Sequence, residues 1–176
     1  IEQVNHVPVA YLLNLKPKQV VDEVRRFQEL VSDDEADAWG AYISDRQATE
    51  YVIAVKQAKS IGLFHRIVGG LSSQGLSILS AEIHTQPGKL AWDRFVVEDP
   101  DFDGAPAPYR IAEVCQQLIQ CVNPQNRKPP TFRRIWRVGE TDSSMRTQPT
   151  QVRFDNATSD EHTIISVFAY DRTGLL

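Results

Sequence analysis

The sequence predicts an α+β fold in which two helices pack on an antiparallel sheet. Residues 50–56 are rich in β-branched side chains that partly alternate with polar ones, which indicates a strand. Two more strands are predicted at 76–85 and 90–99, separated by a Gln-Pro-Gly-Lys turn. Apolar residues at helical spacing predict a helix over 63–71 and a second over 111–122. The order is strand, helix, strand, strand, helix.

A fourth strand would complete the split βαβ, or ferredoxin-like, arrangement. The best candidate is 150–154, Thr-Gln-Val-Arg-Phe, after the second helix. Alternation in the strands predicts that one sheet face meets the helices and the other stays free. A free face or a sheet edge is where a second such unit could pair. The Gly69-Gly70 pair within the first helix predicts a close approach of another helix.

The N-terminal part predicts a separate helix and a short strand. Residues 8–13 form an apolar, extended segment between prolines. Pro17 suits the first turn of a helix that runs to about Val31. After an acidic break at 33–37, residues 38–43 are a short strand that could form a hairpin with the strand around Tyr51.

Composition excludes several classes of protein. The 176 residues are 41% hydrophobic, enough for a core, and carry 19 basic and 23 acidic side chains without a basic stripe, which argues against nucleic acid as a partner. No apolar run reaches the roughly 20 residues of a membrane span, and the N-terminus does not resemble a signal peptide. We therefore expect a cytoplasmic protein that does not bind a membrane. Cys115 and Cys121, six residues apart on one predicted helix, cannot be bridged and are expected as reduced thiols.

The residues form no recognisable catalytic or metal-binding constellation. The four histidines show no metal-ligand spacing, and no nucleophile elbow, phosphate-binding loop or carboxylate pair is present. Residues 99–104 have acidic residues but lack the terminal Glu of a calcium loop, which predicts a plain loop. Gly62 lies where a strand becomes a helix, so backbone N–H groups there could hold the carboxylate of a small ligand. The alternative is a glycine that only permits a tight turn.

The sequence also repeats itself. Residues 50–64 align with 162–176, each a strand followed by a polar turn and a Gly-Leu-apolar sequence, with one residue less before the second glycine. Such a repeat predicts two tandem units. The chain begins at Ile1 without a methionine and stops where the second unit's helix would begin, so we expect a fragment of a longer protein.

These features resemble a known family. The strand followed by Asp-Arg-Thr-Gly-Leu-Leu at 171–176 resembles the opening of ACT domains, regulatory modules of βαββαβ topology that bind small ligands. More specifically, 62–67, 76–85, 93–97 and the Val-Arg-Phe-Asp-Asn stretch at 152–156 are similar to the C-terminal region of protein-PII uridylyltransferase/uridylyl-removing enzymes. The resemblance implies a linker helix and short strand at 1–48 following a hydrolase (HD) domain. It further implies a first ACT domain at 49–157, with a polar linker at 123–149, and the truncated start of a second at 158–176.

The resemblance also implies a role in nitrogen regulation. In this family a nucleotidyltransferase domain adds UMP to the PII signalling protein, an HD domain removes it, and tandem ACT domains sense glutamine. The implied partners are glutamine or another small amino acid, PII through the full-length enzyme, and a neighbouring ACT domain or a second copy. Both catalytic domains, with their implied Mg²⁺, would lie upstream of Ile1, so these residues would carry no catalytic group and no cofactor.

The ligand-binding residues depart from the family pattern. ACT domains of this kind usually have Asp-Arg-Pro-Gly at the first turn, and an Asn followed three residues later by an Asp in the second strand. The resemblance maps ligand binding onto Lys59, Ser60, Gly62, Leu63, Ser77 and Ser80 in the first unit, and onto Asp171, Arg172 and Gly174 in the second. Because the first unit lacks the carboxylates, it could bind weakly or act as a scaffold. Two alternatives stay open: a structural or protein-interaction module without a ligand, and an ACT sensor of another amino-acid-responsive enzyme.

Overall fold

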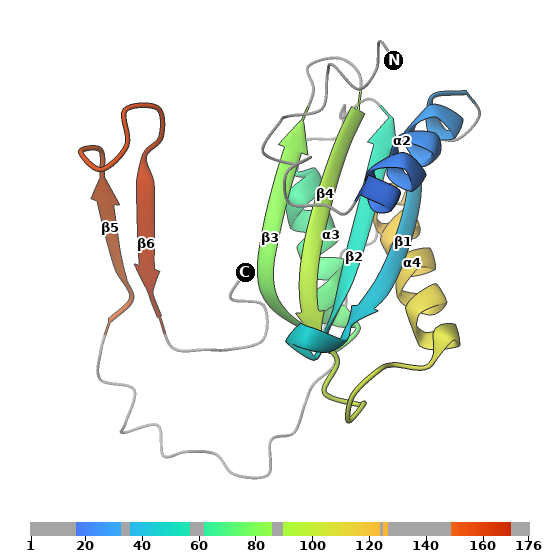
Figure 1. The fold of residues 1–176 in the computed structure, drawn as a ribbon. Coiled ribbons are helices and arrows are strands. Elements are labelled where there is room, and N and C mark those ends of the chain that lie inside the picture. The colour runs from blue at the N-terminus through green and yellow to red at the C-terminus, as the bar shows by residue number, and fades with distance from the viewer. Residues whose placement is uncertain are drawn as a thin grey trace. The chain divides into compact units, whose positions relative to one another are not determined.

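A four-stranded antiparallel sheet forms the centre of the first of two compact units, which comprise residues 1–133 and 134–175 (Figure 1). The computed structural model describes residues 17–32, 36–56, 62–85, 90–123, 125–126 and 149–169. The predicted extended segment at 8–13 and the predicted turn at 86–89 lie outside these ranges.

The sheet order is β1-β2-β4-β3, with every neighbouring pair antiparallel. The strands are β1 (Ala36–Ile43), β2 (Ala48–Lys56), β3 (Ser77–Thr85) and β4 (Leu90–Glu98). Three helices accompany them: α2 (Pro17–Ser32), α3 (Leu63–Ser73) and α4 (Pro108–Val122). This arrangement confirms the predicted α+β class, and the helices and strands read from periodicity lie close to their predicted positions.

Helices α3 and α4 cover one face of the sheet and enclose the main core. Alternate residues of β2 and β4 point toward them, with Tyr51 opposite Phe95 in the ladder. The helices meet at Gly70, where an added Cβ would lie 2.8 Å from Sγ of Cys121. The predicted close helix approach is therefore confirmed, since no larger residue fits there without displacing the thiol. Both cysteines are free, as expected.

Helix α2 packs on the opposite face, so the prediction of a free face is wrong for the central strands. Its Phe27 and Leu30 contact Trp92 in a second apolar cluster. Beside this cluster, both carboxylate oxygens of Glu23 accept hydrogen bonds from Nη2 of Arg94, at 2.8 and 3.0 Å. Arg94 also forms an ion pair with Glu50 on β2. The amphipathic α2 needs an apolar surface, and this sheet face supplies it.

The prediction that residues 150–154 form the fourth strand of this sheet is also wrong. The sheet is completed by β1, which pairs with β2 through a hairpin, as the spacing had suggested. The hairpin turn is the short 3₁₀ helix η2 (Ser44–Arg46) and Gln47, whose φ of 49° is left-handed. A short turn brings β1 to β2 at little entropic cost, whereas 150–154 would have to return across residues 123–149.

The second unit contains a two-stranded hairpin of β5 (Gln151–Asp155) and β6 (Ile164–Phe168). Asp155 holds the intervening loop by accepting hydrogen bonds from the N–H groups of Ala157 and Thr158 and from the Thr158 hydroxyl. The hairpin exposes apolar side chains along both strands, namely Val152, Phe154, Ile164, Ile165, Val167 and Phe168. Strand β5 precedes β6 as β1 precedes β2, so the internal repeat includes the leading strand as well.

Candidate functional site

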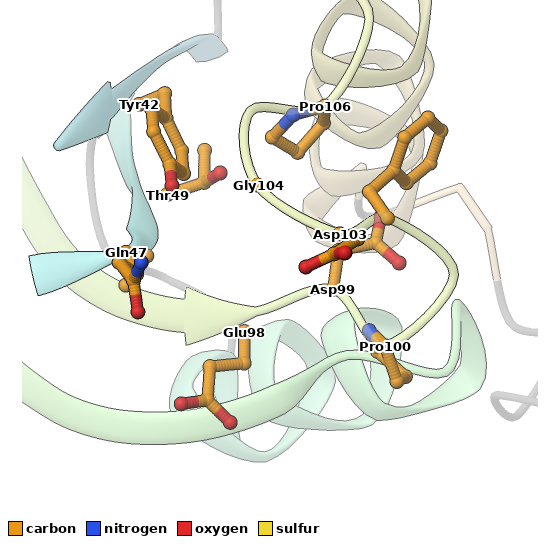
Figure 2. Close-up of a pocket in the computed structure, with 11 residues that line it drawn as sticks. Tyr42, Gln47, Thr49, Glu98, Asp99, Pro100, Asp103, Gly104 and Pro106 are labelled. Carbon is orange, nitrogen blue, oxygen red and sulfur yellow. The ribbon is translucent and has the colours of Figure 1, made fainter. Parts of the chain in front are cut away.

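A half-open pocket of about 420 Å³ lies at the end of the sheet where β2 begins and β4 ends (Figure 2). Its walls are the β1–β2 turn and the loop 99–106 that leads from β4 to α4. Six of the lining residues are polar: Tyr42, Gln47, Thr49, Glu98, Asp99 and Asp103. None of the lining residues is basic, so the pocket presents acceptor groups and negative charge.

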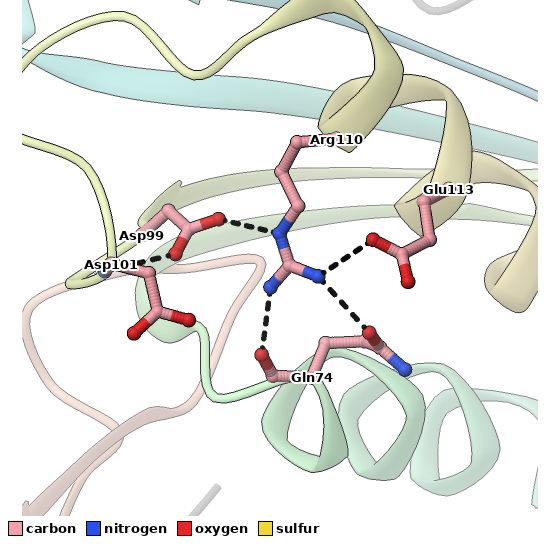
Figure 3. A network of polar contacts seen from close by, with 5 residues as sticks. All are labelled: Gln74, Asp99, Asp101, Arg110 and Glu113. Atoms are coloured by element: carbon pink, nitrogen blue, oxygen red, sulfur yellow. Dashed lines mark hydrogen bonds and ion pairs between the residues drawn. The ribbon is translucent and has the colours of Figure 1, made fainter.

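Arg110 organises the back of this site (Figure 3). From the first turn of α4, its Nε donates to Oδ2 of Asp99 at 2.9 Å, and its Nη1 donates to Glu113 at 3.1 Å. The guanidinium also reaches the end of α3, where Nη1 donates to the side-chain oxygen of Gln74 at 3.2 Å and Nη2 to its backbone carbonyl at 2.8 Å. One buried side chain thereby joins α3, α4 and the loop that walls the pocket.

The charges of this network stabilise one another. Burial alone would lower the pKa of Arg110, but the hydrogen bonds and charges of Asp99 and Glu113 outweigh it and raise that pKa above its ordinary value. Asp99 is therefore neutralised by a permanent cation behind the pocket wall. By contrast, Glu98 and Asp103 are exposed at the rim, and neither forms an ion pair with another described residue.

The predicted ligand-binding residues of the first unit lie elsewhere. Gly62 caps the N-terminus of α3 with φ 80°, and no side chain hydrogen-bonds to this end of the helix. Leu63 is the first residue of that helix. Ser77 is at the opposite end of the sheet, paired with Glu98, and Ser80 is paired with Val96.

The structure does not bring these residues together within one unit. Helix α3 separates Gly62 from Ser77, and its 11 residues at about 1.5 Å each span roughly 16 Å. Ser80 shares its sheet face with Val96 and Arg94, which is the face toward α2 and not toward α3. The remaining predicted residues, Lys59, Ser60, Asp171, Arg172 and Gly174, lie outside the described ranges.

Sequence reasoning missed the pocket and its polar lining. The sequence predicts a plain loop at 99–104, although the acidic residues of this loop and the Arg at 110 are a signal of the polar network. The partners Tyr42, Gln47 and Thr49 come from the β1–β2 hairpin, and nothing in the sequence links them to that loop. Among the described residues, no three His, Cys, Asp or Glu side chains are placed to hold a metal ion. No described helix has the length and apolar character needed to cross a membrane.

The fold defines the class of protein: an α+β domain of the ACT-like, ferredoxin type, with two helices on one face of a four-stranded antiparallel sheet. No family model matches the chain. Curated relatives do match it, and those named below are all bifunctional uridylyltransferase/uridylyl-removing enzymes. The chain is similar to a segment of these enzymes, as a fragment of such a protein would be.

Three of these relatives show the extent of the match. The enzyme of Gluconobacter oxydans is 32% identical over 138 residues, which cover 76% of this chain and 14% of the relative. That of Erythrobacter litoralis is 30% identical over 136 residues, or 75% of this chain and 14% of the relative. That of Pasteurella multocida is 29% identical over 184 aligned residues, covering 100% of this chain and 19% of the relative. The chain thus spans only about one seventh to one fifth of these relatives.

Proposed function

We propose that this chain is the amino-acid-sensing, regulatory region of a bifunctional uridylyltransferase/uridylyl-removing enzyme, and that the amino acid is glutamine. The observation that carries the proposal is the match of the chain, over 75% to 100% of its length, to enzymes of that name. The ferredoxin-type sheet is a fold suited to small-ligand regulation. No catalytic constellation is found among the described residues, which favours a regulatory over a catalytic role.

In this role the chain would control UMP addition to PII and UMP removal from it through a coupling free energy. Glutamine must bind one arrangement of the regulatory region better than another, and a difference of about 1 to 3 kcal/mol would shift the catalytic domains between their two activities. We propose the cytoplasm as the compartment of this protein.

The ligand would use the start of α3. Its first backbone N–H groups have no side-chain cap, and the space where a Cβ of Gly62 would stand is open. A carboxylate is the group that such a helix end favours. Because Ser77 and Ser80 lie away from this end, a site that uses them as well would be formed between two copies of the chain, with β3 of one copy facing the α3 turn of the other.

Strand β3 supports such pairing. It is an edge strand, and its Leu79 and Ile83 are exposed by 50% and 46%. Natural edge strands are usually protected by lysine, proline or a covering element, and the described residues of β3 include neither lysine nor proline. The expected partner is a neighbouring ACT unit or a second copy of the chain.

Calorimetry of glutamine against this chain and against the full-length enzyme tests the proposal. We expect saturable binding, with glutamate binding more weakly because it replaces a neutral amide by a charge. Ser77→Ala combined with Ser80→Ala should weaken binding, while Ser44→Ala, an exposed serine of the η2 turn, serves as the matched control. Equal glutamine affinity in the uridylylating and the deuridylylating states of the full-length enzyme would refute the proposed regulation.

A second candidate function is an interaction module that binds no ligand, favoured by the exposed β3 edge and by the loss of the family's carboxylates. In that case neither this chain nor the full-length enzyme binds glutamine, and the chain self-associates. Leu79→Lys should then abolish association in sedimentation velocity, because a lysine at a sheet edge opposes pairing. Val21→Lys, on the exposed side of α2, is the control and should leave association unchanged.

A further inference from the structure

We propose that Asp93 of β4 binds the ammonium group of an α-amino acid whose carboxylate is held by the first backbone N–H groups of α3. This inference rests on the proposed function, because it names the protein group that would hold the other charge of that ligand. Asp93 is not among the residues that the family resemblance maps onto the ligand. Its placement, its burial and its unpaired oxygen indicate this role.

The start of α3 offers donors to a carboxylate. The backbone N–H of Arg66 donates to the carbonyl of Gly62 at 3.0 Å, which is the first hydrogen bond of the helix. The N–H groups of Leu63, Phe64 and His65 come before it and have no acceptor within the helix. No side chain caps them, and a Cβ added at Gly62 would meet no atom within 4 Å.

Asp93 is on the sheet face that α3 covers. It is opposite Ile53 in the β2–β4 ladder and two residues from Phe95, and both of these belong to the core beneath α3 and α4. Because side chains alternate between the two faces of a strand, the carboxylate extends from this same face. The ring of Phe64, in the first turn of α3, stacks on Phe95 with the centroids 6.2 Å apart. The first turn of the helix is therefore adjacent to this part of β4.

The length of α3 places its N-terminus level with Asp93. At the other end of the helix, Arg110 joins Gln74 to Asp99, which follows the last residue of β4. The 11 residues of α3 span about 16 Å, and strand residues advance about 3.4 Å each, so the helix runs along about five residues of β4. Counting back from Glu98 leads to Asp93. The carboxylate thus lies at the end of α3 that carries the free N–H groups.

The carboxylate of Asp93 has an oxygen without a partner. Asp93 is 3% exposed, and its Oδ1 forms no hydrogen bond with any described residue. Burial raises its pKa to about 6 against the effect of a hydrogen bond from the backbone of His84, so the group is still ionised at pH 7. A buried anion with an unsatisfied oxygen is unfavourable. An ammonium would bring both the opposite charge and the missing N–H donor.

The two groups together select a zwitterion. The start of a helix favours an anion, and a buried carboxylate favours a cation. An α-amino acid carries both charges on one carbon atom, so it can satisfy the two groups at the same time. A simple amine would leave the helix N–H groups without an acceptor, and a simple carboxylate would leave Asp93 without a donor.

The amino acid would enter from the open edge of the sheet at β3. The two ladder neighbours of Asp93 differ, since Ile53 is 1% exposed and Ile83 is 46% exposed. On the helix side, Phe64 is 45% exposed. These two exposed apolar side chains border the site and would contact the methylene groups of the amino acid. Exposed side chains change rotamer within nanoseconds, so their rotation would open the way to the carboxylate.

Calorimetry with three ligands, on the 176-residue chain and on the full-length enzyme, tests the inference. The ligands are L-glutamine, 4-carbamoylbutanoate, which lacks only the amino group, and 4-aminobutanamide, which lacks only the α-carboxylate. Each truncated ligand should bind at least about tenfold more weakly than glutamine, because a hydrogen bond between charged groups is lost. Asp93→Asn should weaken glutamine binding by a similar factor and leave the affinity for 4-carbamoylbutanoate unchanged.

Glu82→Gln is the matched control. Glu82 is exposed and pairs with Arg94, so it lies one residue from Ile83 and on the opposite face of the sheet. The substitution removes one negative charge close to Asp93 without a change at the site, and the affinity for glutamine should stay the same. Urea unfolding shows that each variant is folded. A general change of fold would weaken glutamine and 4-carbamoylbutanoate alike, whereas loss of the ammonium contact weakens glutamine alone.

The possible outcomes separate this inference from the proposed function. If glutamine binds and Asp93→Asn binds it equally well, the role of Asp93 is overturned while glutamine sensing stands. The same holds if 4-carbamoylbutanoate binds the wild type as tightly as glutamine, a comparison that needs no variant. If alanine or glutamate binds and Asp93→Asn weakens it, while glutamine does not bind, the inference stands and glutamine is the wrong amino acid. If none of the three binds either protein at millimolar concentrations, both proposals are overturned.

Discussion

Replacement of Asp93 by asparagine should make the protein more stable at neutral pH. Asp93 is in β4, opposite Ile53, on the face covered by α3 and α4. It is 3% exposed, and its Oδ1 has no hydrogen-bond partner among the described residues. Burial raises the pKa of this carboxyl from 3.8 to about 6, and a hydrogen bond from the backbone of His84 opposes the rise.

The direction of the pH dependence follows from these two pKa values. Below about pH 3.8 the carboxyl is protonated in both the folded and the unfolded chain, so it causes no penalty. Between about pH 3.8 and 6 the unfolded chain has released the proton and the folded chain keeps it, so the free energy of unfolding falls as the pH rises. Above about pH 6 both states are ionised and the loss is complete.

The loss amounts to about 3 kcal/mol, because the pKa rises by about 2 units and each unit corresponds to 1.36 kcal/mol. Asparagine has the same shape, does not ionise, and can still accept the hydrogen bond from His84. Asp93→Asn should therefore remove most of this pH dependence and raise the free energy of unfolding at pH 7 by up to about 3 kcal/mol.

Urea unfolding of the wild type and the variant, at several pH values from 4 to 7.5, measures both effects. Asp45→Asn, an exposed carboxyl in the η2 turn, is the control and should leave the pH dependence as it is. The reasoning is refuted if Asp93→Asn destabilises the protein at pH 7 and the slope between pH 4 and 6 is unchanged. That result would mean that the ionised carboxylate is stabilised in the fold.

Three further changes test the packing around the site by urea unfolding. Gly70→Ala should cost about 1 to 3 kcal/mol by pushing a methyl group against Sγ of Cys121, and a second change, Cys121→Ala, should restore most of it. Arg110→Met should lower the free energy of unfolding by about 3 kcal/mol, since it leaves Asp99 buried without its cation. Adding Asp99→Asn should recover part of that free energy, and no recovery would contradict the pairing of Arg110 with Asp99. Gln47→Gly should stabilise the protein by up to about 1 kcal/mol, because glycine accepts the φ of 49° without strain; a loss of stability would show that the Gln side chain contributes more.

Local periodicity was a reliable guide to the helices and strands. The stripe over 111–122 identified α4, and the alternation around 76–85 and 90–99 identified β3 and β4, each within a few residues of its observed bounds. The double glycine gave the close contact of α3 with α4. These features depend on neighbouring residues only, so the sequence alone contains the information for them.

Strand partners were predicted less well. Both 38–43 and 150–154 have the composition of an edge strand, and composition does not say which one pairs with β2. The structure places β1 there and pairs β5 with β6. The prediction of a free sheet face is wrong for a related reason. The sequence shows that α2 is amphipathic, but the surface on which α2 packs, around Trp92, forms only when the strands come together.

The sequence by itself determined the α+β class, the succession of elements and the resemblance to a regulatory region of uridylyltransferases. Only the tertiary structure decided the pocket, since Thr49 and Asp103 are 54 positions apart in the chain and meet because β2 and β4 are antiparallel neighbours. The charge state of Asp93 and the neutralisation of Asp99 by Arg110 likewise depend on burial and on distances between elements. Secondary structure follows from short-range sequence patterns, whereas a site is made by contacts that only the folded chain creates.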